Sequence, residues 1–209
     1  MRGLYVVTPD WDDTQQLLEV TEAALRGGAA MVQYRHKTAS VDLRREQAEC
    51  LLALCRSYQT PLVINDHVDL CLDIDADGIH VGGTDASVAQ VRAAVGFKKI
   101  VGASCYGDLD LARIAYRDGA SYIAFGGFFP SRIKKYPVTT PFEIITQAKA
   151  EIPLPSVVIG GMTQHNSAPL VASGADMVAV ISSVYMAGAP ELAARGFARM
   201  FIDQELCAA

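Results

Sequence analysis

Three polar side chains alternate in a short segment that follows an apolar run. The segment is Gln33-Tyr34-Arg35-His36-Lys37, and it comes directly after Met31 and Val32. Successive side chains of an extended chain point to opposite sides, so Gln33, Arg35 and Lys37 share one side. An amide beside two fixed cations predicts a site for an anion such as a phosphate group.

Two carboxylates follow neighbouring apolar runs. Asp66 stands in the pair Asn65-Asp66, and Asp85 lies shortly after the run that ends at Val81. If these runs are adjacent parallel strands, both carboxylates lie on adjacent loops at one edge. Carboxylate oxygens suit a hard cation such as Mg²⁺, so the sequence predicts that Asp66 and Asp85 share a magnesium ion.

Small and hydroxyl-bearing residues end several other apolar runs. Ser104 ends one, and a loop with hydroxyl and cationic groups, 126–135, follows another. Gly160-Gly161 and Ile181-Ser182-Ser183 leave backbone N–H groups accessible to a phosphate. Taken singly, an Asn-Asp or Gly-Gly pair is typical of a tight turn. Their joint placement favours a ligand site, because converging charges cost desolvation unless a ligand completes them.

The residues between these sites predict alternating strands and helices. Short runs rich in Val, Ile and aromatic residues predict strands at Leu4–Val7, Met31–Tyr34, Leu62–Ile64, Gly78–Val81, Ile100–Ala103, Tyr122–Phe125, Val157–Ile159 and Met177–Val180. Helical spacing separates them, which implies parallel strands covered on both faces. At about 26 residues per unit, residues 1–209 are expected to form a single α/β domain, a (β/α)8 TIM-type barrel. A doubly wound open sheet is the alternative.

Composition excludes several classes of protein. Hydrophobic residues make up 51% and charged residues 20%, the balance of a globular chain. A formal charge of −5 argues against a dedicated nucleic-acid or anionic-membrane binder. Five scattered cysteines suggest neither a disulfide framework nor a zinc knuckle, and no apolar stretch approaches a membrane span. We therefore expect a soluble, unsecreted, cytoplasmic protein that binds small molecules; association into a homo-oligomer stays open.

No pattern indicates a nucleophile with its base. His80 lies within an apolar run and is expected to be a packed, hydrogen-bonded core histidine. None of the histidines pairs with a Cys, Ser or Asp in a recognisable triad, so nucleophilic catalysis has no support.

The motifs together resemble the thiamine phosphate synthase family. Gln33 to Lys37 match Q-x-R-x-K, Asn65-Asp66 match N-D, and 77–85 is similar to D-G-[IV]-H-[LV]-G-x-x-D. Gly102-Ala103-Ser104, Phe129 to Lys134, Ile159-Gly160-Gly161 and Val180-Ile181-Ser182 follow in the family's order. The resemblance spans residues 5 to about 185. Each motif alone is a weak signal, and together they are specific to the family.

The resemblance implies a transferase that joins 4-amino-2-methyl-5-hydroxymethylpyrimidine diphosphate to 4-methyl-5-(2-phosphoethyl)thiazole by Mg²⁺-assisted dissociative substitution. It implies catalytic roles for Arg35, Lys37, Ser104 and Lys134, and Mg²⁺ on Asp66 and Asp85. The substrate-binding residues that it implies are Gln33, Tyr34, Arg35, His36, Lys37, Asn65, Ser104, Ser131, Arg132, Ile133, Lys134, Gly161, Ile181 and Ser182. Among these, Gln33 and Ser104 would address the pyrimidine, and Ser131 to Ile133, Gly161, Ile181 and Ser182 the thiazole phosphate.

Five positions depart from the family's usual pattern. Gly83 replaces a common Gln, His67 a common Arg, Ser131 and Ile133 each replace a Thr, and Tyr106 stands where His or Thr is frequent. Ser131 keeps the hydroxyl group, and Ile133 loses it. Three alternatives therefore stay open: a thiazole tautomerase, a non-catalytic barrel that senses thiamine phosphate, and an aldolase-type barrel with Lys37 or Lys134 as a Schiff base.

Overall fold

Parallel strands and helices alternate along the chain. The computed structural model describes residues 1–82, 86–130 and 140–208, with the side chains of 203–208 left out. Within these residues the strands are β1 (Gly3–Val7), β2 (Ala29–Tyr34), β3 (Leu62–Asn65), β4 (Gly78–Val81), β5 (Ile100–Tyr106), β6 (Tyr122–Gly126), β7 (Ser156–Ile159) and β8 (Met177–Val180). The helices are α1 (Thr14–Arg26), α2 (Val41–Ser57), α3 (Val68–Asp73), α4 (Val88–Val95), α5 (Leu109–Arg117), α6 (Glu143–Glu151), α7 (Gln164–Ala172), α8 (Ser182–Tyr185) and α9 (Pro190–Ala208).

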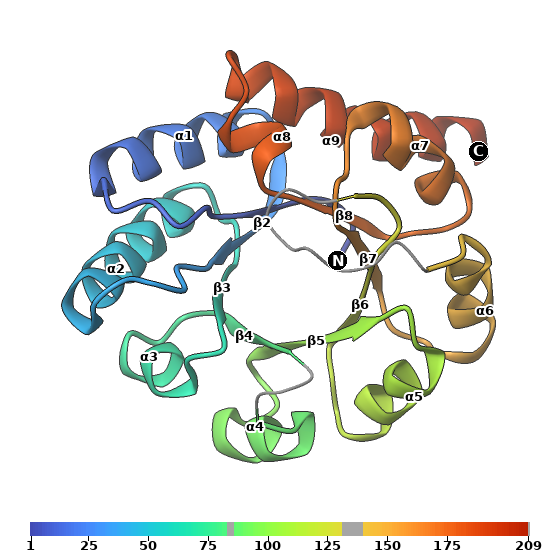
Figure 1. The fold of residues 1–209 in the computed structure, drawn as a ribbon, viewed down its shortest axis with the longest axis horizontal. Coiled ribbons are helices and arrows are strands. Elements are labelled where there is room, and N and C mark those ends of the chain that lie inside the picture. Colours follow the sequence, from blue (N-terminus) through green and yellow to red (C-terminus); the bar gives the residue numbers. More distant parts are fainter. Residues whose placement is uncertain (83–85, 131–139, 209) are drawn as a thin grey trace.

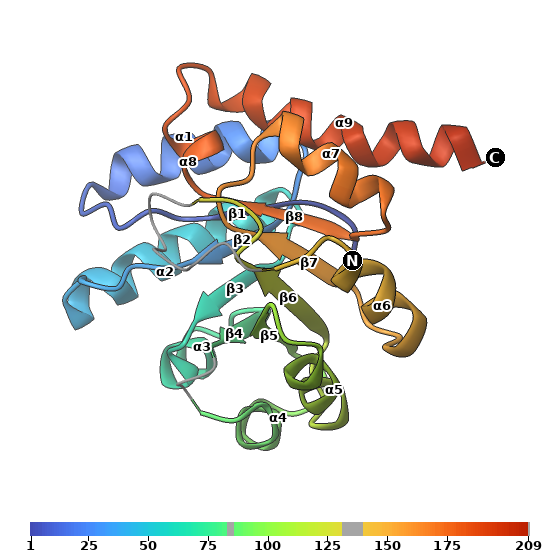
Figure 2. The ribbon, with the colours of Figure 1, turned by 45° about the vertical axis from the view of Figure 1, so that its right-hand side comes forward.

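The strands close into a barrel in sequence order. Each pairs in parallel with its neighbours, and β1 also pairs with β8, where Leu4 lies opposite Val178. The helices form a ring around this barrel, with α9 lying beside α1 (Figures 1 and 2). The (β/α)8 prediction is confirmed and the open sheet is wrong. Among the described residues, no helix is long and apolar enough to cross a membrane.

Alternation along the strands divides the core into two shells. Residues such as Tyr5, Met31 and Met177 point into the barrel and form an inner apolar cluster. Their neighbours in sequence, such as Val32 and Val178, pack outward against the helices. Because both shells are apolar at the middle of the strands, polar side chains collect at the strand ends.

Glycines set the connections that bring the chain from helix to strand. Gly28, Gly119 and Gly174 have φ of 95°, 92° and 105°, and each follows the C-cap residue of a helix. This is the left-handed position that glycine adopts without steric cost.

Arg92 holds together the end of the barrel where the strands begin. Its buried guanidinium donates to the carbonyl oxygens of Gly119 at 2.9 Å, Gly96 at 2.6 Å and Lys99 at 2.7 Å, and to Ser121 Oγ at 2.9 Å. Arg92→Met removes all four of these hydrogen bonds, and of the four acceptors Ser121 Oγ keeps one other donor, the Val101 N–H. We expect a loss of about 3 kcal/mol or more in the free energy of unfolding.

Urea unfolding followed by circular dichroism measures this loss. Arg117→Met removes the same side chain from an exposed position on α5 and should change stability by less than about 0.5 kcal/mol. Equal effects of the two substitutions would contradict the role assigned to Arg92.

Candidate active site

The carboxyl ends of the strands gather most of the predicted residues that the structure describes. Gln33 lies near the end of β2 and points into the barrel, where its Nε2 donates to Tyr5 Oη at 2.5 Å. Arg35 and Lys37 follow the same strand. Arg35 Nη1 lies 3.1 Å from both carboxylate oxygens of Asp10, and Lys37 Nζ pairs with Asp66 Oδ2. The alternation predicted from the sequence thus brings an amide and two cations to one rim.

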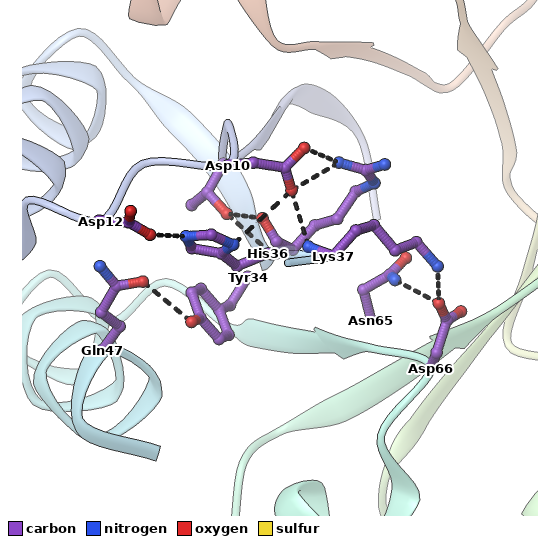
Figure 3. A network of polar contacts seen from close by, with 10 residues as sticks. Asp10, Asp12, Tyr34, His36, Lys37, Gln47, Asn65 and Asp66 are labelled. Carbon is purple, nitrogen blue, oxygen red and sulfur yellow. Dashed lines mark hydrogen bonds and ion pairs between the residues drawn. The ribbon is translucent and has the colours of Figure 1, made fainter. Parts of the chain in front are cut away.

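The turn after β3 positions Asp66. The residue has φ of 63°, a left-handed conformation that Asp tolerates better than most residues, and its N–H donates to the His80 carbonyl oxygen at 2.9 Å. Asn65 is buried and donates from Nδ2 to Asp66 Oδ2 at 2.6 Å. Figure 3 shows the Lys37 side chain reaching from its own segment to this carboxylate. Asn65, Asp66 and Lys37 are therefore in contact.

Asp10 is a site residue that sequence reasoning missed. It lies just after β1, and its Oδ1 accepts both the Arg35 guanidinium and, at 2.7 Å, the backbone N–H of Lys37 (Figure 3). Thr8 fixes the same segment, because its Oγ1 donates to the Arg35 carbonyl oxygen at 2.9 Å. The available signal was Thr8-Pro9-Asp10, a polar loop at the end of the first strand.

Tyr34 and His36 lie on the other side of the segment from Gln33. Tyr34 packs in the outer shell and donates its hydroxyl to Gln47 Oε1 at 2.9 Å. The buried ring of His36 has Nε2 3.0 Å from Asp12 Oδ1 (Figure 3). These two predicted substrate-binding residues are thus not brought together with Gln33, Asn65 and Asp66, and a direct substrate contact by either stays a prediction.

Buried polar contacts link Gln33 to Ser104 through the barrel interior. Tyr5 Oη lies 2.8 Å from Tyr122 Oη, which lies 2.8 Å from His80 Nδ1. His80 Nε2 in turn lies 2.9 Å from Ser104 Oγ. Burial raises the pKa of both phenols, Tyr5 and Tyr122, so they stay protonated. The core-histidine prediction for His80 is confirmed.

The ends of β7 and β8 lie close to the start of the loop after β6. Gly160 and Gly161 have φ of 104° and 64°, and a Cβ on Gly161 would lie 2.3 Å from the Pro130 carbonyl oxygen. Ser182 begins α8 directly after Ile181, and Ser183 Oγ donates to the Met162 carbonyl oxygen at 2.5 Å. The hydrogen bond between Ser183 and Met162 thus holds the segment of Ser182 next to that of Gly161. A phosphate site shared by the two segments requires this proximity.

The other predicted residues lie outside the described part of the chain. They are Asp85, Ser131, Arg132, Ile133 and Lys134, together with Gly83. Their roles stay predictions.

The side chains near Asp66 suit some metal ions and not others. Within residues 1–82, 86–130 and 140–208, no group of three or more His, Cys, Asp and Glu side chains could hold a metal ion. Mg²⁺ usually takes one or two protein carboxylates and leaves its other positions to water and substrate phosphates. The partly exposed Asp66 carboxylate, in contact with the Asn65 amide and the Lys37 ammonium, fits that pattern and does not fit a zinc-type site.

Comparisons with known proteins agree on one family. A family model described as thiamine monophosphate synthase matches residues 4–184. A thiamine-phosphate synthase of Janthinobacterium sp. (strain Marseille) is 67% identical over 201 residues, which cover 96% of this chain and 97% of that one. The thiamine-phosphate synthase of Nitrosospira multiformis is 45% identical over 202 residues, covering 97% and 86%.

A solved structure agrees with these relatives. The thiamine phosphate pyrophosphorylase of Pyrococcus furiosus superposes with a TM-score of 0.85 at 29% identity, covering 96% of each chain. The resemblance drawn from the motifs is thereby confirmed. The chain therefore belongs to the thiamine monophosphate synthase family, whose members are transferases of thiamine biosynthesis.

Proposed function

We propose that this enzyme joins 4-amino-2-methyl-5-hydroxymethylpyrimidine diphosphate to 4-methyl-5-(2-phosphoethyl)thiazole, forming thiamine phosphate and diphosphate. The cluster of Arg35, Lys37, Asn65 and Asp66 carries the proposal, because two cations and a carboxylate converge at one rim of the barrel. The names of the relatives and the family motifs support the same substrates.

The proposed reaction breaks the C–O bond between the pyrimidine methylene and the diphosphate. The electron pair leaves with diphosphate, and the thiazole nitrogen then forms the new C–N bond. Negative charge grows on the leaving group, so Arg35 and Lys37 would stabilise it more in the transition state than in the ground state. No nucleophile or strong base from the protein is needed, which agrees with the lack of a triad in the sequence.

Magnesium is part of the proposal. Asp66, with Asp85 from the sequence, would hold Mg²⁺, which when bound would neutralise charge on the diphosphate. Asn65 orients the Asp66 carboxylate through its 2.6 Å hydrogen bond, while Lys37 contacts the same oxygen. Asp10 would hold Arg35 and the Lys37 backbone at the rim, so that both cations meet the leaving group in a fixed position.

Gly161 tests the proposed thiazole phosphate site. Gly161→Ala strains a backbone at φ 64° and drives a Cβ to 2.3 Å from the Pro130 carbonyl oxygen. We expect the KM for the thiazole phosphate to rise about tenfold or more, the cost of one or two lost hydrogen bonds. The KM for the pyrimidine diphosphate should stay within about twofold of wild type.

Steady-state kinetics with one substrate varied at a time separates the two constants. Gly188→Ala is the matched control, since a Cβ there meets nothing within 4 Å. An equal rise in both KM values for Gly161→Ala would contradict the assignment of this loop to the thiazole phosphate.

The function itself is tested by incubating the protein with both substrates and Mg²⁺ and measuring thiamine phosphate as fluorescent thiochrome. We expect many turnovers, abolished by EDTA and restored by added Mg²⁺. Stoichiometric binding of thiamine phosphate without turnover would indicate a sensor, and isomerisation of a thiazole carboxylate phosphate would indicate a tautomerase. Labelling by borohydride with a carbonyl substrate would indicate the aldolase-type reading. The cytoplasmic location stays a prediction, and association into a homo-oligomer stays open.

A further inference from the structure

A continuous file of hydrogen-bonded side chains crosses the inside of the barrel. It begins at Gln33 on β2, passes through Tyr5, Tyr122 and His80, and ends at Ser104 on β5, across the barrel from β2 (Figure 1). Its successive contacts are 2.5, 2.8, 2.8 and 2.9 Å long. The three middle residues are buried, with exposed fractions of 1% for Tyr5, 0% for Tyr122 and 6% for His80.

The packing around this file holds its middle in place. The Tyr122 ring stacks on His80 at an interplanar angle of 18° and meets Tyr5 edge-on at 89°. A Cβ at position 102 would lie 2.0 Å from Tyr122 Cζ and 2.2 Å from its hydroxyl, so Gly102 makes the space in which that hydroxyl reaches His80. Buried phenols cost free energy unless both their hydrogen and their oxygen are paired, and here they are paired with each other and with His80.

Proton counting then gives the file a direction. Gln33 presents Nε2 to Tyr5, and an amide nitrogen can only donate. If each phenol donates its single hydrogen within the file, Tyr5 donates to Tyr122 and Tyr122 donates to His80 Nδ1. The neutral imidazole then carries its hydrogen on Nε2 and donates to Ser104 Oγ. The carbonyl oxygen of Gln33 then points away from Tyr5. The hydroxyl of Ser104 can still donate its hydrogen to another group.

With this direction the file fixes the Gln33 carbonyl oxygen as an acceptor facing away from Tyr5 and leaves the Ser104 hydroxyl hydrogen as a donor. An aminopyrimidine offers the complementary pair, because its exocyclic amino group donates and its ring nitrogen accepts. The 4-oxo counterpart reverses the pattern, with a carbonyl acceptor and a ring N–H donor. To place a donor where the Gln33 carbonyl oxygen lies, the amide must turn over, and every hydrogen in the file then reverses.

We propose that Tyr5, Tyr122 and His80 are positioning residues that set the hydrogen-bond polarity of Gln33 and Ser104, and so select an amino-substituted pyrimidine over its oxo-substituted counterpart. The inference rests on the proposed function, in which Gln33 and Ser104 address the pyrimidine. Tyr5, Tyr122 and His80 themselves need not touch the substrate. Their effect is on which of two ligands binds, and this separates the proposal from a purely structural role for a buried network.

The test compares inhibition constants of two unreactive ligands, the pyrimidine monophosphate and its 4-oxo counterpart. For the wild type we expect the inhibition constant of the amino compound to be lower than that of the oxo compound by about a hundredfold or more. The reason is that the oxo compound leaves two polar groups mismatched. Tyr122→Phe removes one oxygen and breaks the file at its middle, so both ends can reverse. We expect the ratio of the two constants to fall about tenfold or more.

Tyr185→Phe is the matched control. Tyr185 is also buried, with its hydroxyl 2.9 Å from Thr21 Oγ1, and it lies outside the file. It should keep the wild-type ratio. A folded Tyr122→Phe that keeps the wild-type ratio would overturn the proposal. If Tyr122→Phe does not fold, Tyr5→Phe breaks the adjoining contacts and is judged by the same ratio.

Failure of the proposed function has a different signature. A wild-type protein that neither forms thiamine phosphate nor binds either pyrimidine would refute the function, and the inference with it. If the wild-type protein discriminates between the ligands, and Tyr122→Phe and Tyr5→Phe discriminate equally well, the inference is refuted and the proposed function is not.

Discussion

Asp66→Ala is expected to lower kcat about a thousandfold, equivalent to about 4 kcal/mol of transition-state stabilisation. Two effects combine in this variant. The carboxylate that contacts Lys37 and accepts from Asn65 is lost, so both partners lose the group that orients them. The proposed magnesium ligand is lost as well. Turnover of the pyrimidine diphosphate at saturating thiazole phosphate, measured over a series of Mg²⁺ concentrations, gives the size of each contribution.

Asp66→Asn separates the two effects. The amide keeps the shape and can still accept from Asn65, but it is a poor ligand for Mg²⁺ and carries no charge for Lys37. We expect Asp66→Asn to need more Mg²⁺ for half-maximal rate and to recover part of its activity at high Mg²⁺. Asp110→Ala, which removes a carboxylate from an exposed ion pair with Arg113, should keep wild-type kinetics. A wild-type kcat in Asp66→Ala would remove this residue from the mechanism.

The barrel could be predicted because the same local pattern, a short apolar run followed by a stretch with helical spacing, repeats along the sequence. Runs such as Leu62–Ile64 and Val157–Ile159 have the length and composition of buried strands, and each lies next to a stretch with helical spacing. Parallel strands joined by helices place all their carboxyl ends at one edge. That rule brought Lys37 and Asp66 together in the prediction, and the structure brings them into contact.

The end of β5 differs most from what its sequence indicated. β5 was expected to end at Ala103 and extends to Tyr106, with a register shift between Ser104 and Tyr106. Tyr106 has φ of 52°, a conformation that a bulky residue rarely takes and that no propensity predicts. The irregularity is a product of pairing with β6, so it depends on residues distant in sequence.

The contacts that complete the site were beyond local reasoning. Asp10 has the sequence context of an ordinary turn residue, and its role appears only when the fold brings it to Arg35. Tyr5 and Tyr122 are separated by 117 positions, and both read as apolar strand residues. Their hydroxyls meet because the interior positions of β1 and β6 face each other inside the closed barrel, a fact of geometry rather than of composition.

Arg35→Met is expected to lower kcat/KM for the pyrimidine diphosphate by about two to three orders of magnitude. The guanidinium is fixed before substrate arrives. Its side chain has an exposed fraction of 10%, and its Nη1 lies 3.1 Å from both oxygens of Asp10. The backbone of Arg35 is tied to Thr8 Oγ1 by two hydrogen bonds, of 2.8 and 2.9 Å. A cation held in this way loses little entropy on binding a diphosphate, so its removal costs more than the loss of an exposed charge.

Arg35→Lys tests whether geometry or charge matters. Lysine keeps the charge but lacks the planar fork that can hold Asp10 and a phosphate oxygen at once. We expect a loss of about tenfold, between wild type and Arg35→Met. Arg45→Met, at an exposed arginine of α2 that pairs with Glu49 and Asp73, is the control and should keep wild-type kcat/KM. A lysine variant as slow as Arg35→Met would show that the fork, and not the charge, is what the leaving diphosphate requires, whereas full activity in Arg35→Met would remove Arg35 from the diphosphate site.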